Sequence, residues 1–198
     1  MLVLAADTSL PILSVALVSD GALVGATAIE GRGSRNEKLL PAIDWLLDEN
    51  AIDRRTIDLF AVTRGPGSFT GVRIGLATMQ GMALALGRPV CAMSTHEAIA
   101  HGYEGRVAVV DDAGRGELYV SVFESGTELV APHLAAEAPD GRVLRIESVQ
   151  QHDNVALRCA RRALEIEERG DGHRYRDVTP IYVRLAEAEV KLRQRQNA

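Results

Sequence analysis

The segment that decides the fold is Arg64-Gly65-Pro66-Gly67-Ser68-Phe69-Thr70-Gly71-Val72-Arg73, a glycine-rich loop. It follows a short apolar run, residues 59–63, and precedes a longer one, residues 72–86. This order predicts a strand, a loop over residues 65–71 and a helix. Free backbone N–H groups and the helix dipole at such a helix start favour an anion. The same glycines equally suit a tight turn that passes close to a neighbouring backbone, with Thr70 capping the helix, and we favour this second interpretation.

Known phosphate-loop signatures match this segment poorly. No Gly-Lys-Ser/Thr follows at the spacing of a Walker loop, and Thr70 stands at the third glycine position of Gly-x-Gly-x-x-Gly. No acidic residue lies about twenty positions further on to hold a ribose. The residues that we keep as a candidate nucleotide or anion loop are Asp7, Gly65, Gly67, Ser68 and Thr70.

Hydrophobic patterning predicts the remaining elements of the first half. The Asp20-Gly21 pair between two β-rich runs is a strong hairpin signal. The expected elements are strands at residues 2–6, 13–18, 22–28 and 90–93, an amphipathic helix at 34–50 and a short helix at 95–101. Together with the strand and helix around the loop, the order is β-β-β-α-β-α-β-α, which differs from the alternating units of a Rossmann fold.

An internal repeat indicates a duplicated architecture. Asp7 lies fourteen residues before Gly21, and Asp112 lies fourteen residues before Gly126. Each copy has a strand before its aspartate, with the second expected at residues 107–111, and a hairpin after it. The second half is abbreviated, because residues 132–172 show only polar loop and one amphipathic helix near 155–168. We therefore expect an α/β chain of two subdomains, 1–102 and 103–198, ending in a charged, helix-prone tail.

The helix expected at residues 72–86 has almost no polar face. Its small residues recur at spacings of three and four, and only Arg73, Thr78 and Gln80 break the apolar surface. Such a helix must be covered on both sides in a globular protein. Its sheet covers one side, and either a partner chain or another helix of the same chain covers the other.

Composition excludes several functional classes. A net charge of −5 over 198 residues argues against a domain that grips nucleic acid alone, since phosphate contacts need clustered Lys and Arg. The longest apolar run is too short to cross a bilayer, and the N-terminus lacks the basic region of a signal peptide. Cys91 and Cys159 form no zinc or disulfide pattern, which fits a reducing compartment. We expect a cytoplasmic protein without membrane contact.

The aspartates allow two interpretations, and the histidines argue against a metallohydrolase. Asp7 and the pair Asp111-Asp112 end equivalent strands, where an ATP-handling fold of duplicated halves would use them, although aspartates there also simply make turns. His96 and His101 lie about 140° apart around a helix axis and do not easily share one metal. No metal site is predicted, and no Ser-His-Asp spacing is recognisable.

Several stretches, spread in order over most of the chain, resemble the TsaB family. They are Asp7-Thr8-Ser9, Gly65-Pro66-Gly67-Ser68-Phe69-Thr70-Gly71-Val72-Arg73-Ile74-Gly75, Ser94-Thr95-His96-Glu97-Ala98, Asp112-Ala113-Gly114-Arg115-Gly116-Glu117-Leu118-Tyr119 and Pro180-Ile181-Tyr182-Val183-Arg184. The resemblance implies the actin, Hsp70 and sugar-kinase fold, which is ribonuclease H-like and duplicated. The loop-helix segment is the most specific of the five.

The resemblance also implies a role. TsaB is a non-catalytic scaffold and activator of TsaD in the complex that transfers a threonylcarbamoyl group to adenosine 37 of tRNAs reading ANN codons. It pairs with TsaD through the first two helices of each subunit, and it self-associates through the same surface. The corresponding partner-binding residues here are Glu37, Leu40, Ile43, Arg73, Ala77, Gln80, Gly81 and Leu84. A TsaE-like ATPase joins the complex, tRNA is reached only through it, and ATP or ADP is expected only in the assembly.

Two departures and two alternatives accompany this interpretation. Family members show His-Ser-Glu before Leu-Leu-Pro on the first helix, whereas this chain reads Arg35-Asn36-Glu37-Lys38-Leu39-Leu40-Pro41. The second half is shorter than in many relatives, with residues 132–177 poorly matched.

The main alternative is a small ATP-binding phosphotransferase or ATPase of the same fold. A peptidase is a further alternative, for which the sequence offers no recognisable nucleophile or metal.

Overall fold

The computed structural model describes residues 1–30 and 35–184, and its first half is a five-stranded sheet in the order β3-β2-β1-β4-β5. The strands are β1 (Leu2–Asp7), β2 (Leu13–Ser19), β3 (Ala22–Ile29), β4 (Leu59–Thr63) and β5 (Val90–Met93). β1, β2 and β3 pair antiparallel, whereas β4 pairs parallel to β1 and β5 parallel to β4. The predicted β-β-β-α-β-α-β-α order is confirmed.

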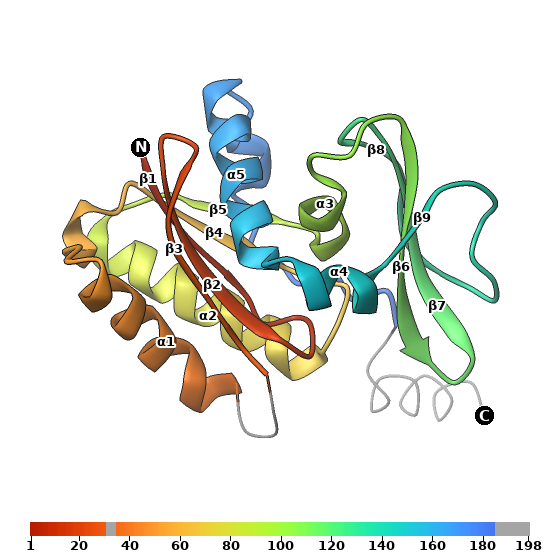
Figure 1. The fold of residues 1–198 in the computed structure, drawn as a ribbon, viewed down its shortest axis with the longest axis horizontal. Helices are drawn as coiled ribbons and strands as arrows, with labels where there is room; N and C mark the ends of the chain where they lie inside the picture. The colour runs from red at the N-terminus through yellow and green to blue at the C-terminus, as the bar shows by residue number, and fades with distance from the viewer. Residues whose placement is uncertain (31–34, 185–198) are drawn as a thin grey trace, which may run out of the picture.

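Helices cover both faces of this sheet, which is why its central strands are continuous apolar runs. The helices are α1 (Arg35–Glu49), α2 (Phe69–Leu86), α3 (Thr95–Ala100) and α5 (Val155–Glu168). Along β1, Leu4 and Ala6 face α1 and α2, while Val3 and Ala5 face α3 and α5. Figure 1 shows α1 and α2 on one side of the sheet and α5 on the other.

The second half is a four-stranded sheet in the order β8-β7-β6-β9. Its elements are β6 (Arg106–Gly114), β7 (Glu117–Glu124), β8 (Thr127–Ala135), β9 (Val143–Arg145) and the short helix α4 (Ile146–His152). Three antiparallel strands followed by a parallel fourth repeat the arrangement of β1 to β4, and no counterpart of β5 occurs among the described residues. The duplicated α/β fold of the actin and sugar-kinase type, with an abbreviated second half, is confirmed.

The two hairpin turns show the duplication residue by residue. Asp20 and Gly21 have φ angles of 47° and 82°, and Ser125 and Gly126 have 46° and 81°, so both turns use the left-handed pair that favours glycine second. The strand register refines the repeat, because Asp7 pairs with Ser14 whereas Asp111 pairs with Tyr119. Since Tyr119 is the counterpart of Ser14, Asp111 and not Asp112 occupies the place of Asp7.

Three local predictions differ from the structure. Helix α2 begins at Phe69 rather than Val72, since Ser68 supplies the N-cap. Residues 132–154, expected as polar loop, contain the end of β8, the three-residue strand β9 and α4, whose brevity hides them from pattern analysis. Helix α5 packs on β1 and β2 of the first half, although it follows the second sheet in sequence. The subdomain boundary between residues 102 and 103 stays a prediction, and the predicted tail after Arg184 lies outside the described residues.

Candidate functional site

The end of β1 is a buried polar turn. Asp7 is fully buried, and its Oδ1 accepts hydrogen bonds from Ser9 N (3.2 Å), Ser9 Oγ (2.5 Å) and Thr63 Oγ1 (2.5 Å). Burial raises the pKa of Asp7, and these hydrogen bonds oppose that rise. The Ser9 hydroxyl also lies 2.9 Å from Thr95 Oγ1 at the start of α3. The turn therefore joins β1, β4 and α3 through side chains closed to solvent.

The backbone of this turn occupies the space that side chains at the loop glycines Gly67 and Gly71 would need. A Cβ on Gly67 would collide with the carbonyl oxygen of Ser9, and one on Gly71 would collide with that of Thr8. The Ser68 backbone N–H donates to the Ser9 carbonyl at 2.7 Å, so it already has a protein partner. The geometry supports close backbone approach, the interpretation that the sequence favoured for these glycines.

The candidate anion-loop residues are thus only partly available to a bound anion. Gly65 is buried, and a Cβ there would lie 2.9 Å from the Ile181 carbonyl oxygen. Ser68 caps α2 by accepting from the Gly71 N–H at 3.2 Å, and it has φ and ψ of −58° and 116°. The prediction that Thr70 caps the helix is wrong, because the helix starts one residue before Thr70, and Thr70 is an exposed first-turn residue.

A cleft of about 480 Å³ separates the loop from the second sheet. Ser9, Gly67 and Ser68 line one side, and the acidic residues Asp111, Asp112 and Glu147 line the other, with no Lys or Arg in the lining among the described residues. Burial raises the pKa of Asp111 to about 6, and the charges of Asp112 and Glu147 add to this effect. Phosphate groups would meet carboxylates of like charge in this cleft.

A buried serine–histidine pair lies deeper between the halves. His96 Nδ1 is 2.7 Å from Ser121 Oγ, and both residues are fully buried. Burial lowers the pKa of His96 to about 3, so the imidazole stays neutral at physiological pH. Because neither side chain reaches the surface, this pair offers a substrate no nucleophile. Among residues 1–30 and 35–184, no group of three or more His, Cys, Asp and Glu side chains could hold a metal ion.

The exposed face of α2 is a continuous stripe along the helix. The residues of this α2 stripe are Arg73, Ala77, Gln80, Gly81 and Leu84, all exposed and all predicted as partner-binding. Leu84, in the last turn of α2, is 81% exposed and has the largest exposed fraction of the large apolar side chains in the described structure. The opposite side of the helix, with Leu76 and Met79, is buried against the sheet. The structure therefore leaves this apolar, small-residue face uncovered within the described chain.

The first helix contributes fewer residues than predicted. Glu37 and Leu40 are exposed, the latter by 47%, and α1 packs beside α2. Ile43 is fully buried in the core with Leu39 and Leu46, because it lies on the helix face toward the sheet. Ile43 therefore offers no exposed side-chain surface to a partner in the single chain.

Three exposed aromatic residues were not predicted, of which Phe69 and Tyr182 lie at the Arg73 end of the stripe and Trp45 lies beside β3. Trp45 on α1 is 52% exposed, and the rings of Phe69 and Tyr182, each 38% exposed, stack with centroids 4.8 Å apart. The Arg73 guanidinium lies 3.8 Å above the Phe69 ring and donates to the Tyr182 hydroxyl at 2.6 Å. Trp45 could have been found as a lone tryptophan on the polar side of an amphipathic helix. Tyr182 is 109 residues from Arg73, so no local pattern links them.

Comparison with known proteins assigns this arrangement to a family. A sequence model described as TsaD: tRNA N6-adenosine threonylcarbamoyltransferase matches residues 33–161, from before α1 into α5. An uncharacterised protein of Mycobacterium tuberculosis is 32% identical over 162 residues, covering 79% of this chain and 77% of that protein. The tRNA threonylcarbamoyladenosine biosynthesis protein TsaB of Bacillus subtilis is 28% identical over 163 residues, covering 79% and 69%.

The solved structure of YeaZ from Pseudomonas aeruginosa superimposes on almost the whole chain. Its TM-score is 0.72 at 28% identity, covering 91% of this chain and 99% of that one. The chain belongs to the TsaB/YeaZ family. In this member of the TsaB family, the glycine loop belongs to the Gly65–Gly75 segment that the sequence marked as most specific, and the α2 stripe begins within that segment at Arg73 and continues beyond it. No helix in the part of the chain that the structure describes has the length and apolarity needed to span a membrane.

Proposed function

We propose that this chain acts in tRNA threonylcarbamoyladenosine biosynthesis as a non-catalytic subunit that binds and activates a TsaD-like catalytic subunit. The TsaB relative in Bacillus subtilis is named for this biosynthesis, and the matching family model is named for the transferase. The proposal includes the threonylcarbamoyl transfer to adenosine 37 of tRNAs that read ANN codons. The observation that carries it is the uncovered α2 stripe.

The stripe has the chemistry of a docking surface. Ala77 and Gly81 let another backbone approach closely, and Leu84 offers a side chain whose burial contributes roughly 1.5–3 kcal/mol. Arg73 and the Phe69–Tyr182 stack extend it at the start of α2, and aromatic and arginine residues often dominate binding energy at protein interfaces. Leu40 on the neighbouring α1 adds apolar area. The first two helices together form the proposed TsaD-binding surface.

The cleft supports a non-catalytic role for this chain. The acidic lining from Asp111, Asp112 and Glu147 disfavours a nucleoside triphosphate. In the loop opposite, the Ser68 N–H already donates to the protein backbone. The residues present therefore do not fit a phosphate group, and ATP or ADP belongs to the assembled complex. The net charge of −5 likewise disfavours tRNA binding by this chain alone, so other subunits would hold the tRNA.

Further partners are part of the proposal. A second copy of this chain would use the same surface as the TsaD-like subunit, so homodimer and heterodimer would exclude each other. A TsaE-like ATPase would join only the assembled complex.

The test is co-purification with the TsaD-like subunit of the same organism. A Cβ at Gly81 meets nothing within 4 Å, so Gly81→Arg should fold normally while placing a bulky charge in the stripe. We expect Gly81→Arg to abolish co-purification, and the matched control Gly81→Ala to retain it. A Gly81→Arg chain that still co-purifies would place the interface elsewhere.

A reconstituted tRNA modification assay tests the role itself. Omitting this chain should abolish threonylcarbamoyl transfer, and adding Gly81→Ala, but not Gly81→Arg, should restore it. Purified chain alone should not hydrolyse ATP. Hydrolysis by the lone chain that disappears in Asp111→Asn would instead favour the ATPase alternative.

A further inference from the structure

A second pocket, separate from the acidic cleft, lies on the α5 side of the first sheet. Its volume is about 620 Å³, which is within the range of small-molecule sites. The β7–β8 hairpin covers it from the second sheet, and α5 with the short 3-10 helix η2 (Gly172–Tyr175) forms the opposite wall. Because α1 and α2 are on the other face of the sheet, the α2 stripe takes no part in it (Figure 1).

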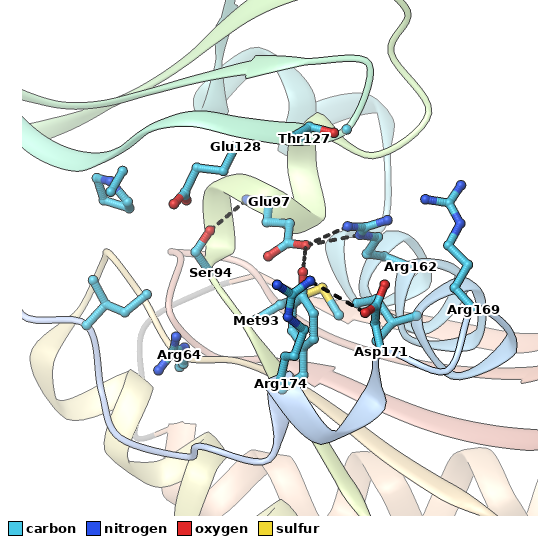
Figure 2. A pocket seen from close by; sticks show the side chains of 16 residues that line it. Arg64, Met93, Ser94, Glu97, Thr127, Glu128, Arg162, Arg169, Asp171 and Arg174 are labelled. Carbon is cyan, nitrogen blue, oxygen red and sulfur yellow. Dashed lines mark hydrogen bonds and ion pairs between the residues drawn. The ribbon is translucent and has the colours of Figure 1, made fainter.

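The charged side chains that line this pocket carry a surplus of positive charge. Four arginines face three carboxylates, so the lining favours a ligand that brings a negative charge. The arginines are Arg64, Arg162, Arg169 and Arg174. Figure 2 shows Arg64 on one side of the pocket and Arg162 and Arg169 together on the other.

Three of these arginines have little attraction left for a ligand. Arg162 is bound by Glu97 at 3.0 Å and by Glu165 at 3.1 Å. Arg169 is bound by Glu165 one turn earlier on α5. Arg174 is 69% exposed, so water screens its charge, and exposed ion pairs contribute little.

Arg64, directly after β4, is the arginine whose guanidinium has an unused edge. Its side chain is only 26% exposed, and its Nη1 donates to Asp177 Oδ2 at 3.1 Å and to the Thr179 carbonyl at 3.3 Å. Its Nε is buried without a hydrogen-bond partner, and its Nη2 makes no hydrogen bond within residues 1–30 and 35–184. A buried donor left unpaired is unfavourable, so a ligand atom that accepts from it would be bound favourably.

The free edge of Arg64 selects an acceptor with two oxygens in one plane. The Nε–H and one Nη2–H of a guanidinium are parallel, and a carboxylate accepts both at once. A carboxylate that enters from the pocket would meet Nη2 with one oxygen and complete the pair at Nε with the other. Phosphate oxygens fit the same edge but bring up to two negative charges at neutral pH.

Glu128 limits how much negative charge the ligand can carry. It is an exposed residue of β8, and its carboxylate faces the pocket across from Arg64 in Figure 2. The Glu128 charge interacts with those of both Arg64 and Glu97. A dianion on Arg64 would therefore meet more repulsion than a monoanion.

Apolar side chains complete the wall beside Arg64. The Ile181 backbone N–H donates to the Arg64 carbonyl at 2.7 Å, which makes the two residues neighbours in the lining. Ala131 and Pro132 line the pocket from β8. Hydrocarbon next to the ligand carboxylate would be removed from water against these side chains.

We propose that this pocket binds a small monocarboxylate with an apolar portion, such as a short aliphatic or aromatic acid, through Nε and Nη2 of Arg64. The ligand supplies the acceptor that the buried Nε lacks and one negative charge for the surplus in the lining. This site goes beyond the proposed docking function and does not depend on it.

NMR titration of the full isotope-labelled chain with hydrocinnamate tests the proposal. We expect the Arg64 Nε–H signal, assigned by its loss in Arg64→Lys, to shift saturably with a Kd below about 10 mM. Hydrocinnamamide has the same shape without the charge and should bind at least about tenfold more weakly, as should acetate, which lacks the apolar portion. Inorganic phosphate should also bind more weakly than hydrocinnamate, and tighter phosphate binding would overturn the monocarboxylate assignment.

Variants of two arginines locate the carboxylate. Arg64→Lys keeps the charge but loses the two-donor edge, so hydrocinnamate should bind at least about tenfold more weakly. The matched control Arg161→Lys makes the same change on the exposed side of α5 outside the pocket and should leave the Kd unchanged. Arg174→Gln should change the Kd by less than about twofold. A larger loss in Arg174→Gln than in Arg64→Lys would place the carboxylate at the other end of the pocket and overturn the proposal.

Glu128→Gln gives a gain of binding that a misfolded variant cannot imitate. Removing the like charge across from Arg64 should tighten hydrocinnamate binding by about two- to threefold at low salt and by less at high salt. The control Glu124→Gln makes the same substitution on β7 outside the pocket and should change nothing. Absence of hydrocinnamate binding, equal binding of hydrocinnamamide, or weaker binding by Glu128→Gln would each overturn the proposal. Binding is measured on the chain alone, so failure here leaves the docking proposal standing.

Discussion

The Thr8 hydroxyl donates a 2.6 Å buried hydrogen bond to the carbonyl of Gly71 and thereby fastens the first turn of α2 to the end of β1. The two backbones approach so closely that a Cβ on Gly71 would collide with the Thr8 carbonyl oxygen. The contact fixes the direction in which α2 leaves the sheet, and hence the face on which its exposed stripe lies.

Gly71→Ala should therefore lower stability although alanine is the better helix former. The added methyl group must displace backbone, so we expect the free energy of unfolding to fall by about 1–3 kcal/mol in urea titrations. The matched control is Gly81→Ala in the same helix, where a Cβ has open space. That variant should gain roughly 0.5–1 kcal/mol. Equal effects of the two substitutions would show that the close approach to Thr8 is not a constraint.

Removal of the Tyr182 hydroxyl tests the strap, which is the segment of residues 176–184 after the 3-10 helix η2 (Gly172–Tyr175). Tyr182→Phe loses the 2.6 Å hydrogen bond from Arg73 Nε but keeps the ring that stacks on Phe69. We expect a loss of about 0.5–1.5 kcal/mol in the free energy of unfolding, toward the lower end because the group is exposed. Tyr119→Phe, whose hydroxyl makes no recorded hydrogen bond in the described structure, should be neutral by the same measurement. If Tyr182→Phe were also neutral, the bond to Arg73 would contribute nothing to holding the strap.

Periodicity and turn chemistry were enough to predict much of the fold. Strands β4 and β5 and helix α5 have the bounds that their apolar patterns predicted, because each element buries its own regular set of side chains. The Asp20-Gly21 turn was equally predictable, since its left-handed backbone favours a small polar residue followed by glycine.

What could not be predicted depends on contacts between distant segments. Leu40 and Ile43 both fit an amphipathic helix, but only the packed sheet decides that Ile43 is buried and Leu40 exposed. Glu97, Glu128 and Arg174 line one pocket only because α3, β8 and the 3-10 helix at residues 172–175 pack together. The single-residue shift that puts Asp111 in the place of Asp7 depends on strand register, which the gapless repeat does not contain.

The acidic cleft should make stability depend on pH through Asp111. Its folded-state pKa of about 6 lies above the ordinary value of 3.8, so the folded chain holds the proton more tightly than the unfolded chain. This contribution to stability is present below about pH 4 and is lost as the pH rises to about 6. Asp111→Asn should therefore be more stable than the parent at pH 8 by about 1–2 kcal/mol, but nearly equal to it near pH 4.

Urea unfolding at several pH values measures this difference. Asp140→Asn, in an exposed loop away from the cleft, is the control and should leave the pH dependence unchanged. A constant difference between Asp111→Asn and the parent across pH 4–8 would mean that desolvation of Asp111 has no energetic consequence.

Leu84 gives the sharpest test of the docking surface. Leu84→Glu replaces a side chain that is 81% exposed in the single chain, so its own stability should change by less than about 0.5 kcal/mol. In a complex the same position would be buried, and the lost apolar burial together with an unpaired charge should weaken association by at least roughly tenfold. Sedimentation of the lone chain reports the homodimer, and titration with the TsaD-like subunit reports the heterodimer.

The matched control is Leu129→Glu on β8, where a leucine is 52% exposed on the second sheet, away from α1 and α2. It makes the same chemical change at an apolar position outside the proposed interface, so both association constants should stay as in the parent. If Leu129→Glu weakened association as much as Leu84→Glu, general surface hydrophobicity rather than the α2 stripe would drive assembly. If Leu84→Glu weakened only the homodimer, the two complexes would use different surfaces, and their proposed mutual exclusion would be wrong.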